Sequence, residues 1–453
     1  MNSKTITKGN PLETEKISKL IVTFAIPSII SMVVNALYNI VDQIFIGQGV
    51  GYLGNGATNV VMPLTVIVIA LSLLVGDGAA AYLSLKLGEG NGNAAAKGIG
   101  NALSATVLIG IILCIVFNIF LKPLCILFGA TEEILPYAMD YGRIISFGVL
   151  FSAIDSCMAG MIRADGNPKY SMAGLLIGCI TNIILDPIFI FVFHWGVKGA
   201  AWATILGQTF NALLYIAYIR KFKSIKLDKS CFVFNKKVLI KVSSLGISSF
   251  ITQIAVVLVM ATTNNILVSY GAKSVYGSDI PLTTIGITMK VNQIISAVII
   301  GLSTGAQPIY GYNYGCGQKD RVKQTYRIIL SVATVFLILA FCIFQFMPMS
   351  IVKLFGSESD LYNQFAVKCF KIFLLACPIN GLQMVTGIFF QAIGKPTQAT
   401  ILSLTRQIIY LLPATILLPT ILGVEGALWA GPVADGLAFI TALIMLKIYW
   451  KKL

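Results

Sequence analysis

Long apolar segments separated by short polar ones run through the whole 453-residue chain. A membrane-spanning helix needs about 20 consecutive, mainly apolar residues. Twelve segments have this character, at roughly 20–46, 60–86, 99–121, 136–162, 169–193, 197–219, 238–270, 281–309, 325–347, 364–392, 397–419 and 424–448. The pattern predicts an all-α integral membrane protein with twelve transmembrane helices.

The second half of the chain repeats the first. Residues 76–103 align without a gap with residues 303–330, an offset of 227, and the same offset pairs 197–203 with 424–430. Because each half holds an even number of spans, both halves insert in the same direction and are related by an axis along the membrane normal. A twofold membrane repeat is typical of secondary transporters, since two similar lobes can rock about a central site.

The repeat divides the chain into five predicted parts. A polar arm precedes the first span, a basic segment joins the two halves, and a short tail follows the last span. The arm lacks the apolar core of a cleavable signal peptide. The predicted parts are an N-terminal arm at 1–19, a first six-helix lobe at 20–219, a linker at 220–237, a second six-helix lobe at 238–449 and a tail at 450–453.

Composition places the chain in a membrane, and its charge predicts an orientation. Only 11% of the residues are charged and 57% are apolar, against about 25% charged residues in soluble domains. With both termini inside, most of the 33 Lys and Arg residues fall on the inner side, which predicts a cytoplasmic (inner) membrane protein with cytoplasmic termini. The net charge of +15 is therefore an orientation signal, and we expect no nucleic-acid partner. The nine cysteines lack paired spacing, so neither disulfides nor a metal site is expected.

Acidic residues inside the spans are the leading functional candidates, because a charge at bilayer depth is costly and is retained for a purpose. The five in the predicted spans are Asp42, Asp77, Asp155, Asp186 and Asp435. At about 1.5 Å of rise per residue, Asp42 and Asp186 both fall toward the outer side and are predicted to share a pocket. Asp77 and Asp155 both fall in the inner half, where they are candidates for a relay.

Polar neighbours distinguish the outer pair from the other acids. One stripe on the first span contains, at the spacing of a single helix face, Asn35, Tyr38, Asn39 and Asp42. On the fifth span Asn182 lies one turn before Asp186, and prolines at 27 and 187 interrupt the two helices. Buried carboxyl groups can take up a proton near neutral pH, and with amide oxygens they can instead bind Na⁺. The residues alone do not choose between the two ions.

The remaining polar residues of the spans each allow two interpretations. Asp155 suits a helix-packing hydrogen bond as well as a relay, and Asp77, between two glycines, suits a helix break. Lys290 either faces a cavity or pairs with Asp435, and Arg406 suits a hydrogen bond between the lobes. Methionines and aromatic rings suit a cavity for flat organic cations. The candidates for the substrate cavity are Asn35, Tyr38, Met158, Met161, Lys290, Gln293, Ser296, Gln391, Arg406 and Asp435.

Several segments, in this order and spacing, resemble the MATE (multidrug and toxic compound extrusion) family, in particular its bacterial DinF-like and MepA-like members. The resemblance covers residues from about 17 to 449. It rests on AIPSIISMVVNALYNIVDQIFIG (25–47), RADGNPKYSM (163–172), TNIILDPIFIF (181–191), GVKGAAWAT (196–204), QAIGKPTQAT (391–400) and GVEGALWA (423–430).

The resemblance implies two six-helix lobes, related by a pseudo-twofold axis, around a central V-shaped cavity. It implies that Asp42 and Asp186 are the coupling carboxylates and that Asn182 and Thr204 belong to the same pocket; the polar stripe adds Asn39. The chain departs from the MepA-like pattern at Ser296, where those members have a carboxylate. This departure weakens the case for a coupling site in the second lobe.

These features favour a secondary active multidrug efflux transporter that works by rocker-switch alternating access. It would exchange organic, cationic amphipathic compounds for H⁺ or Na⁺, act as a monomer in the lipid bilayer, and need no other cofactor. The alternative is a lipid or lipid-linked oligosaccharide flippase, which would need a more basic cavity than Lys290 and Arg406 supply. A pore suits twofold lobes with buried acids less well, and no catalytic constellation is present, so we do not expect an enzyme.

Overall fold

The computed structural model describes residues 11–277, 279–355 and 360–451, and all regular structure in them is helical. The helices before the connection between the lobes are α1 (Pro11–Thr14), α2 (Ile17–Val50), α3 (Tyr52–Gly88), α4 (Gly92–Leu127), α5 (Leu135–Ala164), α6 (Pro168–Pro187), the π-helix η1 (Ile188–Val192) and α7 (Val197–Tyr218). Those after it are α8 (Lys236–Gly271), α9 (Asp279–Gly315), α10 (Lys319–Phe346), α11 (Pro348–Phe355), α12 (Asp360–Phe373), α13 (Cys377–Ala392), α14 (Pro396–Leu404), the π-helix η4 (Thr405–Leu411), α15 (Leu412–Leu422) and α16 (Val424–Trp450). The connection holds two short 3₁₀ helices, η2 (Ile219–Lys221) and η3 (Lys229–Phe232).

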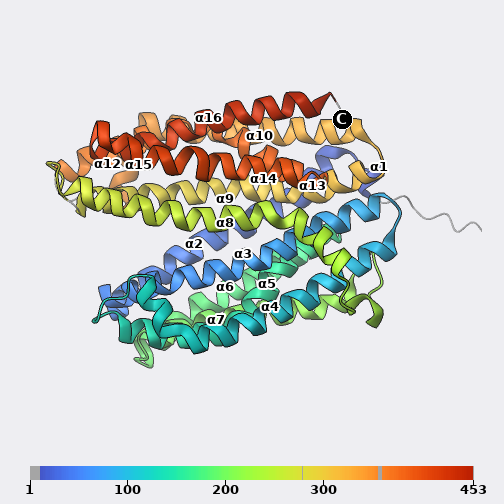
Figure 1. Ribbon diagram of the computed structural model, residues 1–453, viewed down its shortest axis with the longest axis horizontal. Helices are drawn as coiled ribbons and strands as arrows, with labels where there is room; N and C mark the ends of the chain where they lie inside the picture. The colour runs from blue at the N-terminus through green and yellow to red at the C-terminus, as the bar shows by residue number, and fades with distance from the viewer. Residues whose placement is uncertain (1–10, 278, 356–359, 452–453) are drawn as a thin grey trace, which may run out of the picture.

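The helices form two lobes that lie side by side, α2–α7 in the first and α8–α16 in the second (Figure 1). Figure 1 also shows that α1 and the end of α16 lie at the same end of the bundle, which we call the termini end. At this end the ribbons of the two lobes converge, and toward the other end they diverge. The predicted repeat of helices is thus visible as two adjacent bundles.

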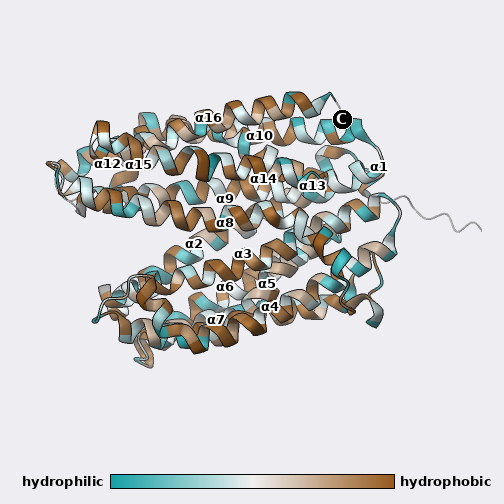
Figure 2. Cartoon of the chain, viewed as in Figure 1, coloured by the Kyte–Doolittle hydropathy of each residue, from teal (hydrophilic) through white to brown (hydrophobic). Residues whose placement is uncertain are grey.

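Ten of the described helices are long and apolar enough to cross a membrane, or eleven if the bent pair α12 and α13 counts as one span. They match the predicted spans with one exception. The sixth predicted span forms the helix α7, but α7 is not among those ten. Large apolar side chains, including Ile119, Leu339 and Ile444, are exposed on the outer faces of both lobes, where hydrophobic residues follow the helices along their length (Figure 2). Such surfaces fit contact with lipid.

The tenth predicted span is a bent pair of helices. It is broken between Phe373 and Cys377, and the two halves, α12 and α13, meet at an angle of 49°. Pro378 stands in the first turn of α13, where the missing backbone N–H of proline is tolerated, whereas a proline within a continuous helix would remove a hydrogen bond. The predicted span at 364–392 thus corresponds to a bent pair of helices, and hydrophobicity did not indicate the break because it depends on this residue.

Backbone-to-backbone contacts join the two lobes near the termini end. A Cβ atom added at Gly305 of α9 would lie 2.6 Å from Cα of Ala25, and one added at Gly301 would lie 2.6 Å from Cα of Ile29, both in α2. Across the other pair of facing helices, Gly246 of α8 lies against the carbonyl group of Leu74 in α3. Glycine is required at these positions because any side chain would separate the helices.

The beginning of the first helix belongs to the core of the second lobe. Leu12, Leu20 and Phe24 are buried in one hydrophobic cluster with residues of α9, α10 and α13. Farther along, α2 packs against α6 of the first lobe. Pro27 lies between these two parts of α2, so the helix that carries Asp42 is anchored in both lobes.

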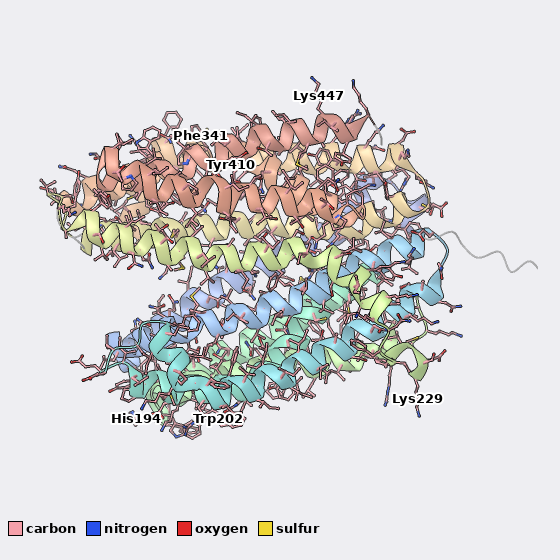
Figure 3. The ribbon with its side chains drawn as sticks, in the orientation of Figure 1. His194, Trp202, Lys229, Phe341, Tyr410 and Lys447 are labelled. Carbon is pink, nitrogen blue, oxygen red and sulfur yellow. The ribbon has the colours of Figure 1, made fainter. Side chains whose placement is uncertain are left out.

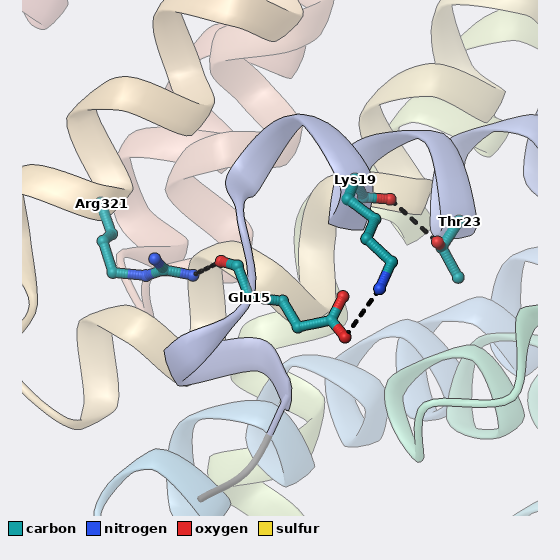
Figure 4. Close-up of polar contacts among 4 residues, drawn as sticks. All are labelled: Glu15, Lys19, Thr23 and Arg321. Atoms are coloured by element: carbon teal, nitrogen blue, oxygen red, sulfur yellow. Dashed lines mark hydrogen bonds and ion pairs between the residues drawn. The ribbon is translucent and has the colours of Figure 1, made fainter.

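Arg321 of α10 fastens this N-terminal segment to the second lobe (Figure 4). Its Nη2 donates to the backbone carbonyl groups of Leu12 at 3.1 Å and Glu15 at 2.8 Å, and its Nε donates to the side-chain oxygen of Asn313 at 2.9 Å. Asn313 in turn donates to the carbonyl group of Leu12 at 3.1 Å. Three polar contacts to one short segment hold it against α9 and α10.

We expect Arg321→Gln to release this segment. Hydrogen bonds from a charged donor contribute about 1.5–3 kcal/mol each, so amide hydrogen exchange across residues 11–20 should become at least about tenfold faster, as measured by mass spectrometry. The matched control is Arg327→Gln, because Arg327 is exposed on the same helix and contacts the ring of Trp450 instead. Unchanged exchange in the Arg321 variant would show that the hydrophobic contacts alone hold the segment.

Candidate functional site

A buried polar cluster lies in the first lobe, where α2, α5, α6 and α7 meet. Asp186 is completely buried, and Asn182 and Thr204 are nearly so. With the Asn182 amide oriented to suit its neighbours, its nitrogen donates to Oδ2 of Asp186 at 2.8 Å. Its oxygen then accepts from the backbone N–H of Thr204 at 3.1 Å and from the Thr204 hydroxyl at 3.3 Å. These contacts connect α6 and α7 through polar groups within an apolar lobe.

Asp42 completes the cluster from α2. Its carboxyl group interacts with that of Asp186 closely enough for the two to share a hydrogen bond. The Oδ1 atom of Asp42 is buried and has no hydrogen-bond partner among the described residues. Two carboxyl groups in such contact repel each other when both are ionised. A proton or a cation between them removes that repulsion, so the pair is suited to bind one.

Small residues and a wide helical turn bring these side chains together. A Cβ atom added at Gly207 of α7 would lie 2.6 Å from the carbonyl oxygen of Gly178 in α6, so the two helices touch one turn from Thr204 and Asn182. Directly after Pro187 the chain forms the π-helix η1, a feature frequent at functional sites. Phe191 in η1 packs edge-on against Phe45 of α2, with ring centroids 6.3 Å apart. This contact positions α2 one turn beyond Asp42.

Two tyrosines border the carboxyl pair. Tyr38 of α2 and Tyr141 of α5 both lie close enough to Asp42 and Asp186 to interact with them electrostatically. Tyr38 was a sequence candidate for the substrate cavity. Tyr141 was missed, because an isolated tyrosine in an apolar span has no polar neighbour at helical spacing that would single it out.

The rest of the predicted stripe on α2 points elsewhere. Asn35 and Asn39 are exposed, and Nδ2 of Asn39 donates to the backbone carbonyl of Asn35 at 2.7 Å and to its side-chain oxygen at 3.1 Å. The structure therefore brings Asp42, Asn182, Asp186 and Thr204 together, while Asn39 bonds along its own helix.

Asp77 and Asp155 have different direct hydrogen-bond partners. The Ser249 hydroxyl of α8 donates to Oδ2 of Asp77 at 2.8 Å, and the Gln391 side chain of α13 donates to Ser249 at 3.1 Å, so this chain of contacts crosses between the lobes. Asp155 accepts from Nδ2 of Asn211 at 2.5 Å within the first lobe. Arg163 of α5 interacts electrostatically with Asp77, and Tyr215 of α7 interacts with both Arg163 and Asp155, so these two residues connect the surroundings of the two acids.

The remaining cavity candidates have varied surroundings. Met158 and Met161 are fully buried in a hydrophobic cluster of the first lobe. Lys290 and Ser296 are half-buried and Gln293 is exposed. Asp435 pairs with Arg406 and not with Lys290, since Oδ1 of Asp435 lies 2.8 Å from Nε of Arg406. That ion pair lies inside the second lobe, so Arg406 does not bridge the lobes as one interpretation suggested.

Two repeated helical lobes and a buried carboxyl pair in one of them define a multi-pass membrane transporter. Comparisons with known proteins agree. The MatE family model matches residues 27–188 and 249–416. The multidrug export protein MepA of Staphylococcus aureus (strain MSSA476) is 26% identical over 442 residues, which cover 96% of this chain and 95% of MepA. MepA of Staphylococcus haemolyticus (strain JCSC1435) is 25% identical over 443 residues, again 96% and 95% of the two chains.

Solved structures show the same relationship. The MATE multidrug transporter DinF-BH, in complex with the dye rhodamine 6G, is 33% identical with a TM-score of 0.88, and 96% of each chain is covered. An outward-facing MATE family transporter of the MOP superfamily shares the fold, with a TM-score of 0.90 at 21% identity over 98% of each chain. The chain therefore belongs to the MATE family of multidrug efflux transporters; it is a membrane transporter and not an enzyme.

Proposed function

We propose that this chain exports amphipathic organic cations in exchange for H⁺ or Na⁺, and that the coupling ion binds at Asp42 and Asp186. The contact between the two carboxyl groups is the observation that carries the proposal. Asn182 and Thr204 add oxygen atoms and hydrogen-bonding groups at the same point. The cluster thus offers a site for either ion.

The proposed coupling follows from charge. When the site is empty of ions, the two carboxylates give the first lobe a negative centre that favours an organic cation. When a proton or Na⁺ occupies it, this attraction falls and the substrate leaves. Each ligand shifts the equilibrium between conformations only by its difference in affinity for them. Competition for the same charge supplies such a difference.

The proposed orientation places both termini in the cytoplasm of a bacterial cell. Basic residues gather at the termini end, where Figure 3 shows Lys229 and Lys447, whereas His194 lies at the opposite end. An excess of Lys and Arg marks the cytoplasmic side of membrane proteins. With this orientation, the glycine contacts between the lobes close the cytoplasmic side, and the conformation is outward-facing.

Substrate preference is proposed from the chemistry of the site and from the relatives. DinF-BH is described in complex with the rhodamine dye, an organic cation, and the MepA proteins are described as multidrug exporters. We extend these properties to this chain and expect a monomer to be sufficient, since each chain holds both lobes. The flippase alternative has no specific support, because the charge of Arg406 is already balanced by Asp435.

The test is competition between ion and dye on purified protein in detergent. Binding of the rhodamine dye is followed by fluorescence anisotropy at alkaline pH without Na⁺, and then with rising Na⁺ or falling pH in separate titrations. We expect the dissociation constant for the dye to increase by about tenfold with one of the two ions. In Asp42→Asn this increase should disappear. If neither ion changes the dissociation constant for the dye in the wild type, competition at this site is refuted.

A further inference from the structure

A second polar pocket lies inside the second lobe, where α9, the start of α13, η4 and α16 meet. Its volume is about 40 Å³, and its polar lining consists of Asn292, Asn380, Arg406 and Asp435. We call it the Arg406 pocket. Drug-sized ligands occupy sites of about 300–1,000 Å³, so this pocket has room for one compact group at the end of a larger molecule.

The Arg406 pocket has unused hydrogen-bonding capacity of both kinds. Nε of Arg406 donates to Oδ1 of Asp435 at 2.8 Å, while the two terminal nitrogens of Arg406 have no hydrogen bond to any described residue. The side-chain oxygen of Asn380 is buried and also lacks a partner in the described part of the chain. Buried polar groups are nearly always hydrogen-bonded in native proteins. The buried oxygen of Asn380 therefore calls for a donor from a ligand or water, and the terminal nitrogens of Arg406 are free to donate to a group bound beside it.

The internal repeat places this pocket at a position related to the ion cluster. The offset of 227 pairs Thr204 of the cluster with Gly431, which lines the Arg406 pocket, and pairs Gln208 with Asp435. A Cβ atom added at Gly431 would lie 3.3 Å from the Phe373 ring, so glycine keeps this side of the pocket clear. The position that carries the Thr204 hydroxyl in the first lobe therefore has no side chain in the second, where it lines the pocket beside Arg406 and Asp435.

The charge of the pocket selects the kind of group that fits. The ion pair between Arg406 and Asp435 is electrically neutral, so a bound carboxylate or ammonium would leave an uncompensated charge in a low-dielectric lobe. An uncharged group with both a donor and an acceptor leaves none. The side chains of Arg406 and Asp435 remain 18% and 11% exposed, so the pair is not sealed off.

We propose that the Arg406 pocket is a substrate subsite that binds an uncharged hydrogen-bonding end group, of the type of a primary carboxamide. Its carbonyl oxygen accepts from the terminal nitrogens of Arg406, and its N–H donates to the oxygen of Asn380. The proposal rests on the proposed function, because it adds a second recognition point for the same exported cations. Substrates bearing such a group at a distance from the cationic centre are bound more tightly than those without it.

The test uses three quaternary ammonium compounds that differ only in the far substituent of one aromatic ring: a primary carboxamide, a methyl ester and a carboxylate. Each competes with the rhodamine dye for the purified wild-type protein. We expect the carboxamide to compete about fivefold more tightly than the ester, since both carbonyl oxygens can accept from Arg406 but only the carboxamide N–H can donate to Asn380. The carboxylate should be no better than the ester. Preference for the carboxylate would overturn the proposal in favour of an anion site, and equal competition by all three would show that the ion pair is only structural.

Two variants separate recognition from folding. Arg406→Met combined with Asp435→Leu replaces a buried ion pair by apolar groups, an exchange that folded proteins often tolerate. This double variant should stay folded but lose the preference for the carboxamide over the ester. Gly431→Ala keeps the ion pair and narrows the pocket, because the added Cβ would lie 3.3 Å from the Phe373 ring, and should weaken the preference as well. If the preference survives in both variants, the group binds elsewhere.

The same experiment distinguishes this proposal from the proposed function. If all three compounds displace the dye equally and the displacement depends on the ion, the proposed function stands and the subsite does not. If none displaces the dye and no ion affects its binding, both fall.

Discussion

Asp186→Asn is expected to abolish ion-driven export while the protein stays folded. The substitution removes the charge that a proton or Na⁺ would neutralise, so the charge of the site no longer depends on the ion. A ligand with equal affinity for two conformations does not change the equilibrium between them. Concentrative transport in proteoliposomes should fall by at least about tenfold. Because Asn182 can still donate to the remaining side-chain oxygen, the free energy of unfolding should change by only about 1 kcal/mol.

The matched control for this variant is Asp140→Asn. Asp140 lies in the same lobe and its exposed carboxylate is 3.3 Å from Lys198, and surface pairs of this kind contribute little. Its transport should equal that of the wild type. The double variant Asp42→Asn/Asp186→Asn should be no worse than either single variant, because the two groups act as one unit. Additive losses would mean that the carboxyl groups act at separate sites.

Gly305→Val is expected to prevent the lobes from meeting at the termini end. The first side-chain atom would lie 2.6 Å from Cα of Ala25 and 2.8 Å from the carbonyl oxygen of Phe24, and backbone atoms cannot yield as a flexible side chain would. The conformation in which the lobes meet at the termini end should therefore be lost, and transport should fall below detection. Hydrogen exchange across residues 21–30 should become faster in the folded fraction.

Gly286→Val supplies the control on the same helix. A Cβ atom added at Gly286 would have no neighbour within 4 Å, so only the helix propensity of the residue changes, and valine is the better helix former. This variant should transport normally. Normal transport by Gly305→Val as well would show that closure at these contacts is not part of the cycle.

Much of the fold followed from the sequence because hydrophobicity decides which segments enter a membrane. The internal repeat, with Gly78 and Gly305 in equivalent positions, predicted the two lobes. The break at Pro378 and the π-helix at Arg406 were not predicted, since both depend on local backbone geometry within segments of uniform hydrophobicity. The burial of Met158 in the core followed from packing between helices, which composition does not specify.

The candidate site was only partly accessible from the sequence. Helical spacing connected Asn182 with Asp186, and depth placed Asp42 at the same level. The membership of Thr204 came from the family resemblance alone, and no pattern identified Tyr141. Asn39 belongs to the same polar stripe as Asp42, yet its side chain is exposed. The stripe of four residues covers two helical turns and is wider than the surface of α2 that packs against α6.

The most direct test of the account measures dye movement in proteoliposomes under one imposed gradient at a time. Liposomes with purified protein are loaded with the rhodamine dye, and an inward gradient of H⁺ or of Na⁺ is applied to the wild type, to Asp42→Asn and to Asp186→Asn. One gradient is expected to drive dye movement in the wild type, and both variants are expected to lose this movement. The assignment of ion coupling to these two carboxyl groups would be contradicted if neither gradient drove dye movement in folded wild-type protein. It would also be contradicted if a gradient still drove dye movement in the variants.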